Sequence, residues 1–499
     1  MDFLSVTELR AIDAAAGPQL YTLMLRAGVA VAAAAARLSR LRGTRRVVCV
    51  AGTGNNGGDA SVAARLLATE GFSVKLLLAA SPERLRGDAQ RAFEAAREAN
   101  ADIEVRDSEA AWQSAAALSG EDIVEGVIVD GLLGTGCAAA PREAVMEAIR
   151  WINRMRGRAL VVSVDLPSGM NGDTGECSGE AVRADWTVTL EAPKTGFLNP
   201  TAPPLLGHVE VANLTGKTPV AVDATAGLIV PEPALERQYD AHKGDFGRVL
   251  VLGGAECYPH APVLSALGAR LGGAGLLTLA APAVSRTAAG AWVPEAMFRE
   301  LPVSAGDGIA GDALERSGLE LDDFQVAVAG PGLTRSADAK TLLEKLLSRF
   351  RGKLLLDADA LALLPESDFA GCSAELLLTP HPGEAARLAG VETREIQRDR
   401  FGWARRIADR YRAVVALKGA GTVVCEPGGR PQINLTGNPG MASGGMGDLL
   451  SGVIAAQWAR MPALAAAANG VARHGTAGDL AALKKFRGTV AATEVAKWI

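Results

Sequence analysis

The sequence has few aromatic residues and no excess of basic charge. Tryptophan, tyrosine and phenylalanine make up only 4% of the 499 residues, whereas glycine occurs 57 times. This composition favours an α/β protein in which helices pack closely on sheets. The formal net charge of −5 argues against nonspecific nucleic-acid binding, which requires a basic surface.

Cysteines at metal-binding or disulfide spacing are also missing. The six cysteines lie far apart in the sequence, and no two of them form a CxxC pair. They are Cys49, Cys137, Cys177, Cys257, Cys372 and Cys425. This distribution argues against a zinc site or a disulfide framework, so we expect reduced thiols in a cytoplasmic protein.

Targeting and membrane segments are not evident either. The first residues, MDFLSVTELRAIDAAAG, contain early acids and lack the apolar centre of a signal peptide. The apolar run VAVAAAAARL is too short to span a bilayer, so we expect it to form a buried helix. We therefore expect no membrane partner.

What recurs instead is an apolar run of strand length, followed by a glycine turn and a helical pattern. The clearest runs are 45–52, 73–80, 125–134, 159–169 and 185–193 in the first half, and 248–254, 275–282, 326–332, 353–361, 375–384, 413–421 and 422–428 in the second. Continuous apolar strands that alternate with helices predict parallel sheets covered on both faces, with ligands at the carboxyl ends of the strands. The length suggests two to four domains. We place two, residues 1–215 and 237–499, joined by a connection at 216–236.

The first glycine loop, AGTGNNGGDAS, follows an apolar run and precedes a helical pattern. It matches neither the GxGxxG fingerprint nor a P-loop. Bare backbone amides at a helix N-terminus are suited to phosphate, and Asn55, Asn56 and Asp59 add polar side chains. A tight β–α turn with Asp59 as the N-cap explains the same residues.

Two further strand ends carry oxygen donors. VIVDGLLGTG ends in Asp130 and a second glycine loop, and VVSVDLPSG ends in Asp165 and Ser168. An amide, a carboxylate and a hydroxyl on neighbouring strand ends suit an alkali cation or Mg²⁺ better than zinc. Each aspartate taken singly also fits a loop cap.

The three motifs GNNGGD, VDGLLGTG and VDLPSGMNGDTGE together resemble the YjeF N-terminal family of NAD(P)H-hydrate epimerases, over about residues 1–215. The resemblance implies a Rossmann-like three-layer α/β fold, a bound K⁺ and interconversion of the R and S epimers of hydrated NADH and NADPH. It implies Asn56, Asp130 and Ser168 as K⁺ ligands, Asp165 as the catalytic acid/base, and Lys194 as a second catalytic candidate. The implied substrate-binding residues are Asn55, Asn56, Gly57, Gly58, Asp59, Gly134, Thr135, Gly136, Cys137, Ala138, Ala139, Ala140 and Asp165.

The second half has its own polar motifs after apolar runs. KGAGT, which begins at Lys418, could hold a nucleotide phosphate or form a hairpin turn. PHPGE offers His381, although a lone histidine is more often structural than catalytic. Asp357 and Asp359 in DADAL could form a metal pair or cap a helix.

The segment SGGMGDLLSG, which begins at Ser443, clusters glycines just before an apolar helical pattern. Glycine loses the most backbone entropy on ordering, so such a cluster is best explained by amides that face an anion. Asp448 in the first turn could cap the helix favourably. Beside a phosphate, an anionic aspartate is tolerable if it acts as general base on the attacking hydroxyl.

The series HKGDFGRVLVLGG, AGPGL, DADAL, TPHPGE, KGAGT and GNPGMASGGMGDLLSG resembles the ADP/ATP-dependent NAD(P)H-hydrate dehydratases, over about residues 230–495. The resemblance implies a ribokinase-like α/β fold and ADP or ATP with Mg²⁺ as cosubstrate. Asp448 is the implied catalytic base, and Ala261, Gly332, His381 and Asp448 are the implied contacts to the hydrated nucleotide. The implied adenine-nucleotide and phosphate contacts are Lys418, Gly419, Ala420, Gly421, Thr422, Gly444, Gly445, Met446 and Gly447.

The two halves thus predict a bifunctional repair enzyme, in which one domain epimerises the hydrate and the other phosphorylates its hydroxyl and eliminates phosphate. The resemblance also implies a homo-oligomer. Two alternatives stay open: a kinase that forms a stable phosphorylated product, and a first domain that only binds a partner.

Overall fold

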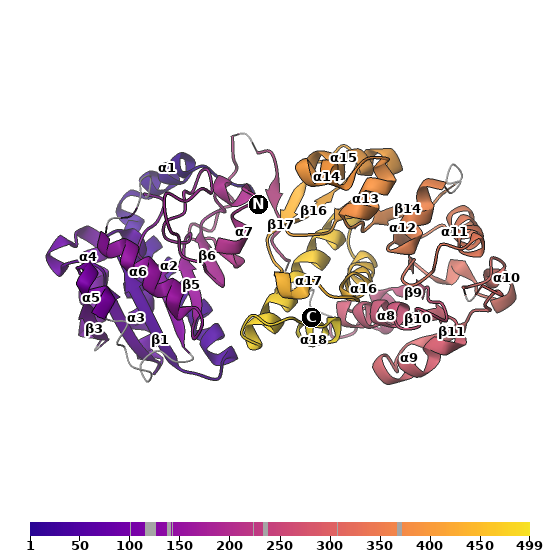
Figure 1. Ribbon diagram of the computed structural model, residues 1–499, viewed down its shortest axis with the longest axis horizontal. Helices are drawn as coiled ribbons and strands as arrows, with labels where there is room; N and C mark the ends of the chain where they lie inside the picture. Colours follow the sequence, from indigo (N-terminus) through magenta and orange to yellow (C-terminus); the bar gives the residue numbers. More distant parts are fainter. Residues whose placement is uncertain are drawn as a thin grey trace. The chain divides into compact units, whose positions relative to one another are not determined.

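The computed structural model describes residues 1–99, 101–114, 126–136, 141, 143–222, 224–232, 238–306, 308–366 and 372–499. The chain divides into two compact units, Met1–Ala224 and Thr225–Ile499 (Figure 1). The division falls inside the segment 216–236 that the sequence suggests as the connection. Residues Gly227–Leu228 form a short strand, β8, that belongs to the sheet of the second unit.

The first unit contains a sheet of seven parallel strands in the order β3-β2-β1-β4-β5-β6-β7. The strands are β1 (Arg46–Ala51), β2 (Ser73–Leu78), β3 (Asp102–Val105), β4 (Val127–Gly131), β5 (Leu160–Val164), β6 (Trp186–Leu190) and β7 (His208–Ala212). The strand order reverses between β1 and β4, so the loops after these two strands diverge and leave room for a ligand. The two polar loops that the sequence singles out follow β1 and β4.

Helices cover both faces of this sheet. They are α1 (Val6–Ala16), α2 (Leu20–Leu41), α3 (Asn55–Thr69), α4 (Gly87–Glu98), α5 (Glu109–Ser114), α6 (Glu143–Met155) and α7 (Pro203–Leu206). On one face, α5 and α6 bury Trp112 and Trp151 against Val48 and Ile128 of the sheet. The helices α2 and α3 pack against each other and against the sheet strands. This three-layer arrangement confirms the predicted Rossmann-like class.

The helix α2 contains the apolar run of the sequence analysis. Among the described residues, α2 is the one helix that could cross a membrane by length and composition alone. The apolar run is too short to do so, but the whole helix is longer than the run. However, 61% of its most apolar window is buried inside the protein. Ala27, Val31 and Leu38 lie on the buried face. The expectation of a buried helix is confirmed.

The second unit contains a ten-stranded sheet in the order β11-β10-β9-β12-β13-β14-β15-β16-β17-β8. Its remaining strands are β9 (Arg248–Leu252), β10 (Leu276–Ala281), β11 (Met297–Glu300), β12 (Val326–Ala329), β13 (Lys353–Leu356), β14 (Glu375–Leu378), β15 (Ala413–Leu417), β16 (Thr422–Cys425) and β17 (Gln432–Asn434). The strands from β11 to β15 are parallel, but β15–β16 and β16–β17 are antiparallel. The expectation of purely parallel sheets is therefore wrong at this edge, because short glycine turns join these strands as hairpins.

Two separate cores form on the two faces of this sheet. Val249 and Val251 of β9 pack with α8 (Ala261–Gly272), α16 (Met446–Trp458) and α17 (Ala463–Lys484). Leu250 and Leu252 of the same strand point to the opposite core. The other helices are α9 (Arg286–Trp292), α10 (Ala313–Ser317), α11 (Ala337–Arg349), α12 (Asp359–Leu363), α13 (Pro382–Ala389), α14 (Thr393–Arg398), α15 (Arg400–Tyr411) and α18 (Ala492–Val495). Alternate residues of an apolar strand thus serve both faces, as a doubly covered sheet requires.

The cysteines match the expectation of reduced thiols. Cys49, Cys177, Cys257, Cys372 and Cys425 are all free. Cys137 lies outside the described residues.

Candidate active sites

Asp130, at the carboxyl end of β4, is fully buried and accepts hydrogen bonds from three residues. Ser168 donates through its hydroxyl (2.6 Å) and its backbone amide (3.0 Å). Ser163 Oγ and the Leu132 amide donate at 2.9 and 3.3 Å. Burial raises the pKa of Asp130 and these hydrogen bonds oppose the shift. The network fixes the carboxylate and the Ser168 hydroxyl next to each other.

Asn56 joins the same cluster from the first turn of α3. Its side-chain amide donates to the carbonyl oxygens of Val164 (2.7 Å) and Leu133 (3.2 Å). Ser168 Oγ in turn lies 3.3 Å from the Leu133 oxygen. A Cβ on Gly134 would stand 2.4 Å from Asn56 Oδ1, so only glycine leaves room for this amide. The structure brings the three predicted K⁺ ligands together.

The loop after β1 is a close-packed glycine turn. A Cβ on Gly57 would stand 2.0 Å from the Gly52 carbonyl oxygen. The helix begins at Asn55, its N-cap is Gly54, and no side chain caps it. Asp59 is the fifth residue of α3, so the alternative that Asp59 is the N-cap is wrong.

Asp165 and Lys194, the two catalytic candidates of the first unit, form a buried ion pair. The Leu190 amide also donates to Asp165 Oδ1 at 3.0 Å. The Lys194 ammonium further donates to Thr189 Oγ1 (2.8 Å) and to the carbonyls of Leu190 and Ala192 (both 3.1 Å). Asp165 has φ of 68°, a conformation uncommon for a residue with a Cβ. Such strain at a buried polar residue is typical of functional sites.

Asp59 contributes a second carboxyl group to this region. It is only 4% exposed, and no described residue donates a hydrogen bond to its carboxylate. Burial, followed by the negative charges of Asp165 and Asp13, raises its pKa well above the ordinary value. The region therefore holds an ion-paired carboxylate and a carboxyl group whose pKa is raised by burial and by its acidic neighbours.

Only part of the second predicted substrate loop can be placed. Gly134, Thr135 and Gly136 follow β4 at the ligand edge of the sheet. The other predicted members, Cys137, Ala138, Ala139 and Ala140, lie outside the described residues.

In the second unit, Asp448 is the third residue of α16. The N-cap is Gly445, in the left-handed conformation (φ 87°), and no side chain caps the helix. Asp448 is therefore not a cap, and no described residue donates a hydrogen bond to its carboxylate. Burial, and then the charge of Asp357, raises the pKa of Asp448 to about 7, although Lys418 acts in the opposite direction. A carboxylate with this pKa is suited to proton transfer near neutral pH.

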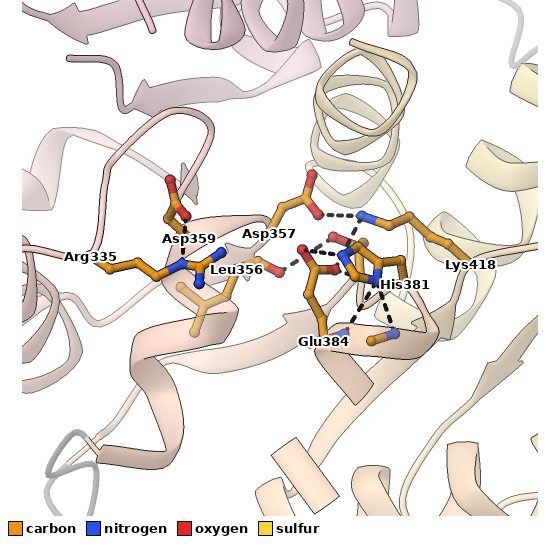
Figure 2. Close-up of polar contacts among 9 residues, drawn as sticks. Arg335, Leu356, Asp357, Asp359, His381, Glu384 and Lys418 are labelled. Carbon is orange, nitrogen blue, oxygen red and sulfur yellow. Dashed lines mark hydrogen bonds and ion pairs between the residues drawn. The ribbon is translucent and has the colours of Figure 1, made fainter. Parts of the chain in front are cut away.

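Lys418 belongs to the polar cluster that Figure 2 shows, in which its ammonium points toward Asp357. Its ammonium lies 2.6 Å from Asp357 Oδ1 and 3.8 Å from Glu384 Oε2. Burial alone would lower the pKa of Lys418, but Asp357 and Glu384 raise it, so the ammonium stays charged. A Cβ on Gly447 would stand 3.3 Å from the Lys418 Nζ, so this cation faces the bare first turn of α16.

The KGAGT motif forms the turn of the β15–β16 hairpin. Gly419 and Gly421 have φ of 137° and 64°, which side chains rarely adopt. Thr422 Oγ1 donates to the Gly419 carbonyl at 3.2 Å. The turn interpretation is correct, and it places Lys418 at the carboxyl end of β15.

His381 is the N-cap of α13. Its Nδ1 accepts hydrogen bonds from the amides of Gly383 (3.0 Å) and Glu384 (3.2 Å), and the His381 amide donates in turn to Glu384 Oε2 (2.7 Å). Burial, and then the charge of Lys418, lowers the pKa of His381. The histidine is thus held in a neutral state beside Lys418, in a structural role that still leaves half of its side chain exposed.

Asp357 and Asp359, the candidate metal pair, belong to separate ion pairs in the structure. Asp357 pairs with Lys418. Asp359 accepts from the Thr334 amide (3.0 Å) and pairs with Arg335 (3.2 Å), as Figure 2 shows for the arginine. Asp359 is also not a cap, since the N-cap of α12 is Ala358 and has no side-chain hydrogen bond.

Two predicted substrate contacts from distant parts of the sequence meet at the ends of β9 and β12. A Cβ on Gly332 would stand 3.3 Å from the Ala261 Cβ and 2.9 Å from the Tyr258 carbonyl oxygen. Gly332 has φ of 67°, and Ala261 is the first residue of α8. The strand order reverses between β9 and β12, where this fold leaves a crevice.

Comparisons with known proteins match both units. The family described as NAD(P)H-hydrate dehydratase matches residues 249–499, and the family described as YjeF-related protein N-terminus matches residues 20–196. The bifunctional NAD(P)H-hydrate repair enzyme of Escherichia coli is 37% identical over 477 residues, which cover 94% of this chain and 86% of the relative. That of Moorella thermoacetica is 38% identical over 454 residues, 88% of this chain and 84% of the relative.

The chain belongs to the family of bifunctional NAD(P)H-hydrate repair enzymes. The family resemblance stated from the motifs is confirmed. Among solved structures, the ADP/ATP-dependent NAD(P)H-hydrate dehydratase of Bacillus subtilis, co-crystallised with ATP/Mg²⁺, is 29% identical, with a TM-score of 0.45. The match covers 52% of this chain and 90% of that chain.

In this repair enzyme, sequence reasoning missed the contribution of α1, which lies outside the residues that the YjeF-related family matches. Leu4 pairs with Lys194 in a β-bridge, and Arg10 of α1 donates to the Thr135 carbonyl at 3.4 Å. Burial, and then the charge of Asp165, raises the pKa of Asp13. The helix therefore lies along the predicted site, and no motif in its sequence signals this position.

Sequence reasoning also missed the residue that anchors the glycine loop before α16. Asp479 of α17 accepts hydrogen bonds from the Gly437 amide and the Asn438 side chain, both at 2.9 Å. The signal was available, since Asp479 lies in the glycine-containing stretch HGTAGD inside a helix, where glycine is costly. The anchor fixes where the loop leaves β17.

Proposed function

We propose that the first unit converts R-hydrates of NADH and NADPH to the S epimers, and that the second unit dehydrates the S-hydrates at the expense of ADP or ATP. The observation that carries the second reaction is Asp448. It is a carboxylate without a hydrogen-bond donor among the described residues, with a pKa of about 7, in the bare first turn of α16 and near a charged lysine.

In the proposed dehydration, Asp448 takes the proton of the substrate hydroxyl as this oxygen attacks the terminal phosphate of the nucleotide. The amides of Gly444 to Gly447 and the Lys418 ammonium stabilise the negative charge that is transferred. The bond between the ring carbon and the phosphate oxygen then breaks, and phosphate leaves with the electron pair. Loss of a proton from the ring restores the double bond of NADH or NADPH. With ADP, the products are AMP and phosphate.

Mg²⁺ in this proposal accompanies the nucleotide. Within the described ranges, no group of three His, Cys, Asp or Glu residues could hold a metal ion. Mg²⁺ keeps several waters and binds nucleotide phosphates readily, so it needs few protein ligands.

In the proposed epimerisation, Asp165 gives a proton to the hydroxyl, which leaves one face of the ring as water, and takes a proton back from the water that adds to the other face. Lys194 fixes the position of the Asp165 carboxyl group through their ion pair. Asn56, Asp130 and Ser168 would hold K⁺, since amide, carboxylate and hydroxyl oxygens are ligands for hard cations. When bound, K⁺ supplies positive charge beside the buried Asp130.

The function is tested with separated R- and S-hydrates, each with ADP and with ATP, by following the absorbance of the reduced nicotinamide. We expect S-hydrate to be consumed directly and R-hydrate to be consumed through the S epimer. If a stable phosphorylated product accumulates and no reduced nicotinamide returns, the kinase alternative replaces the dehydratase assignment.

The K⁺ site predicts the effect of Gly134→Ala. The added methyl group would collide with the Asn56 amide, at 2.4 Å from Oδ1. We expect the K⁺ concentration for half-maximal epimerisation to rise by about ten- to a hundredfold. Gly157→Ala is the matched control, because no atom lies within 4 Å of the added Cβ. Turnover of S-hydrate should stay normal in Gly134→Ala, because the second unit is unchanged. An unchanged K⁺ dependence of epimerisation in this variant would refute the K⁺ site.

The charges around Asp448 predict a pH effect of Asp357→Asn. The negative charge of Asp357 raises the pKa of Asp448, so its removal lowers that pKa below about 7. Because the ionised Asp448 is the active base, the rise of dehydration rate with pH should move to lower pH. Asp359→Asn is the comparison, since Asp359 raises the same pKa less, and it should give a smaller shift. A midpoint that stays in place or rises would contradict the assignment of Asp448.

A further inference from the structure

The turn Lys418–Gly421 needs an external brace. Its two glycines adopt left-handed conformations, and glycine loses the most entropy when a turn becomes ordered. Within the hairpin, the only side-chain hydrogen bond to this turn from a described residue is that of Thr422 Oγ1 to the Gly419 carbonyl. A nucleotide site built on this turn requires the turn to be fixed before the nucleotide arrives, because ordering it on binding would cost affinity.

Arg400, the first residue of α15, supplies the brace. Its Nη2 donates to the carbonyl oxygens of Leu417 (3.0 Å), Lys418 (3.2 Å) and Gly421 (3.1 Å). These carbonyls lie on both arms of the hairpin, so one guanidinium nitrogen ties the start of the turn to its end. The helix α15 packs on β15 and β16, which places the guanidinium against the turn.

The geometry leaves the other side of the guanidinium close to the turn as well. A Cβ on Gly419 would stand 3.1 Å from Arg400 Nη1. Nη1 itself donates to Gln397 Oε1 at 3.1 Å. The guanidinium therefore lies directly against the Gly419 backbone, with neutral oxygens as its hydrogen-bond acceptors.

Arg400 forms no ion pair with any described carboxylate, and its guanidinium donates to backbone carbonyls and to Gln397 instead. On the same helix, Arg406 pairs with Asp399 at 3.1 Å, and in the same cluster Lys418 pairs with Asp357. Arg400 is half-buried, and burial lowers its pKa. A cation that is partly desolvated and held only by carbonyl dipoles is stabilised further when an anion binds nearby.

We propose that Arg400 is a positioning residue of the nucleotide site: it holds the Lys418–Gly421 turn in its binding conformation, and its positive charge favours an anionic adenine nucleotide there. The proposal rests on the proposed function, which assigns this turn to ADP or ATP. The ligand of the Lys418–Gly421 turn in this proposal is a nucleoside diphosphate or triphosphate, and not the hydrated nicotinamide nucleotide.

The test measures ADP binding to the full chain by calorimetry, for the unchanged protein and for Arg400→Lys, Arg400→Gln and Arg406→Gln. Lysine keeps the charge but has a shorter side chain and no second terminal nitrogen, so it cannot bond the turn carbonyls and Gln397 together, whereas glutamine loses the charge. We expect Arg400→Lys to bind ADP about tenfold more weakly, which corresponds to loss of one or two net hydrogen bonds, and Arg400→Gln, which also loses the charge, to bind ADP more weakly still. Arg406→Gln, an exposed position on the same helix, should bind ADP normally.

Steady-state kinetics separate positioning from general damage. For the Arg400 variants we expect a higher KM for ADP, with the KM for S-hydrate and the epimerisation rate unchanged. ADP binding by Arg400→Lys as tight as that of the unchanged protein would overturn the proposal. A parallel rise in both KM values with a lower Tm would also overturn it, since it would indicate a purely structural role. If the unchanged protein binds ADP but does not dehydrate the hydrate, the proposed function fails, while the binding data still decide the role of Arg400.

Discussion

Replacing Asp448 by asparagine is expected to abolish dehydration of S-hydrate while ADP binding and epimerisation continue. Asparagine has nearly the same shape but cannot accept the hydroxyl proton, so we expect the dehydration rate to fall by about 10²–10⁴-fold. Because no described residue donates a hydrogen bond to the Asp448 carboxylate, the change should leave α16 intact. Burial raises the pKa of Asp448 to about 7. The rate of the unchanged enzyme should therefore rise with pH through about 7, as Asp448 ionises, and the residual rate of the variant should lack this rise.

The bifunctional chain supplies internal controls for this variant. R-hydrate should still equilibrate with S-hydrate, and calorimetry should still detect ADP. Asp322→Asn, at an exposed aspartate of the turn Leu321–Asp323, controls for loss of one surface charge. If Asp448→Asn dehydrates S-hydrate at the normal rate with the same pH profile, then Asp448 is not the base.

The strands that the sequence predicts are those that lie inside the sheets. Runs such as RVVCVA of β1 are apolar at nearly every position because helices cover both faces. By contrast, the sequence analysis missed β3 (Asp102–Val105), β7, β8, β11 (Met297–Glu300) and the short strand β17. All of these except β17 are end strands of their sheets, and most residues of β3, β7 and β11 are exposed or only half-buried. An edge strand needs little apolar surface, so its sequence carries little of the signal that identifies the central strands.

In the sites, too, residues in sequence motifs could be predicted, whereas residues brought there by packing could not. Asp130, Ser168 and Lys418 could be singled out because each follows a strand and lies in a glycine-rich motif. The residues that contact them could not be singled out, because these contacts depend on how elements distant in the sequence pack together. Arg400 lies in a helix rich in arginine, and nothing in that stretch distinguishes it from Arg406. Only the packing of α15 on the hairpin gives Arg400 its three carbonyl contacts.

A residue type can also suggest the wrong position within a helix. Asp59 fits an N-cap by type, but the helix begins four residues earlier, and its carboxyl group is buried near Asp165. His381 has a structural role at a position where the family resemblance implies a substrate contact. Its Nδ1 caps α13, and its Nε2 lies 3.4 Å from Glu384 Oε1.

Asp165→Asn is expected to stop epimerisation and to destabilise the first unit. Loss of the acid/base should lower the conversion of R-hydrate by about 10²–10⁴-fold, while S-hydrate is still dehydrated. The change also leaves the Lys194 ammonium, which is only 1% exposed, without its counter-ion. Breaking a buried ion pair by removing one partner costs about 3–5 kcal/mol of unfolding free energy. A loss of activity in this variant alone could therefore reflect unfolding.

The double variant Asp165→Asn with Lys194→Met separates the two causes. Methionine keeps an unbranched apolar chain and removes the buried charge, so denaturant unfolding should show a large part of the lost stability restored. If Asp165 is the acid/base, the stabilised double variant must still lack epimerisation, because the group that transfers the proton is still missing. Recovery of epimerisation together with stability would instead make the pair structural. Normal turnover of R-hydrate by Asp165→Asn itself would show that Asp165 is not the acid/base, and it would favour the binding role that the sequence of the first unit also allows.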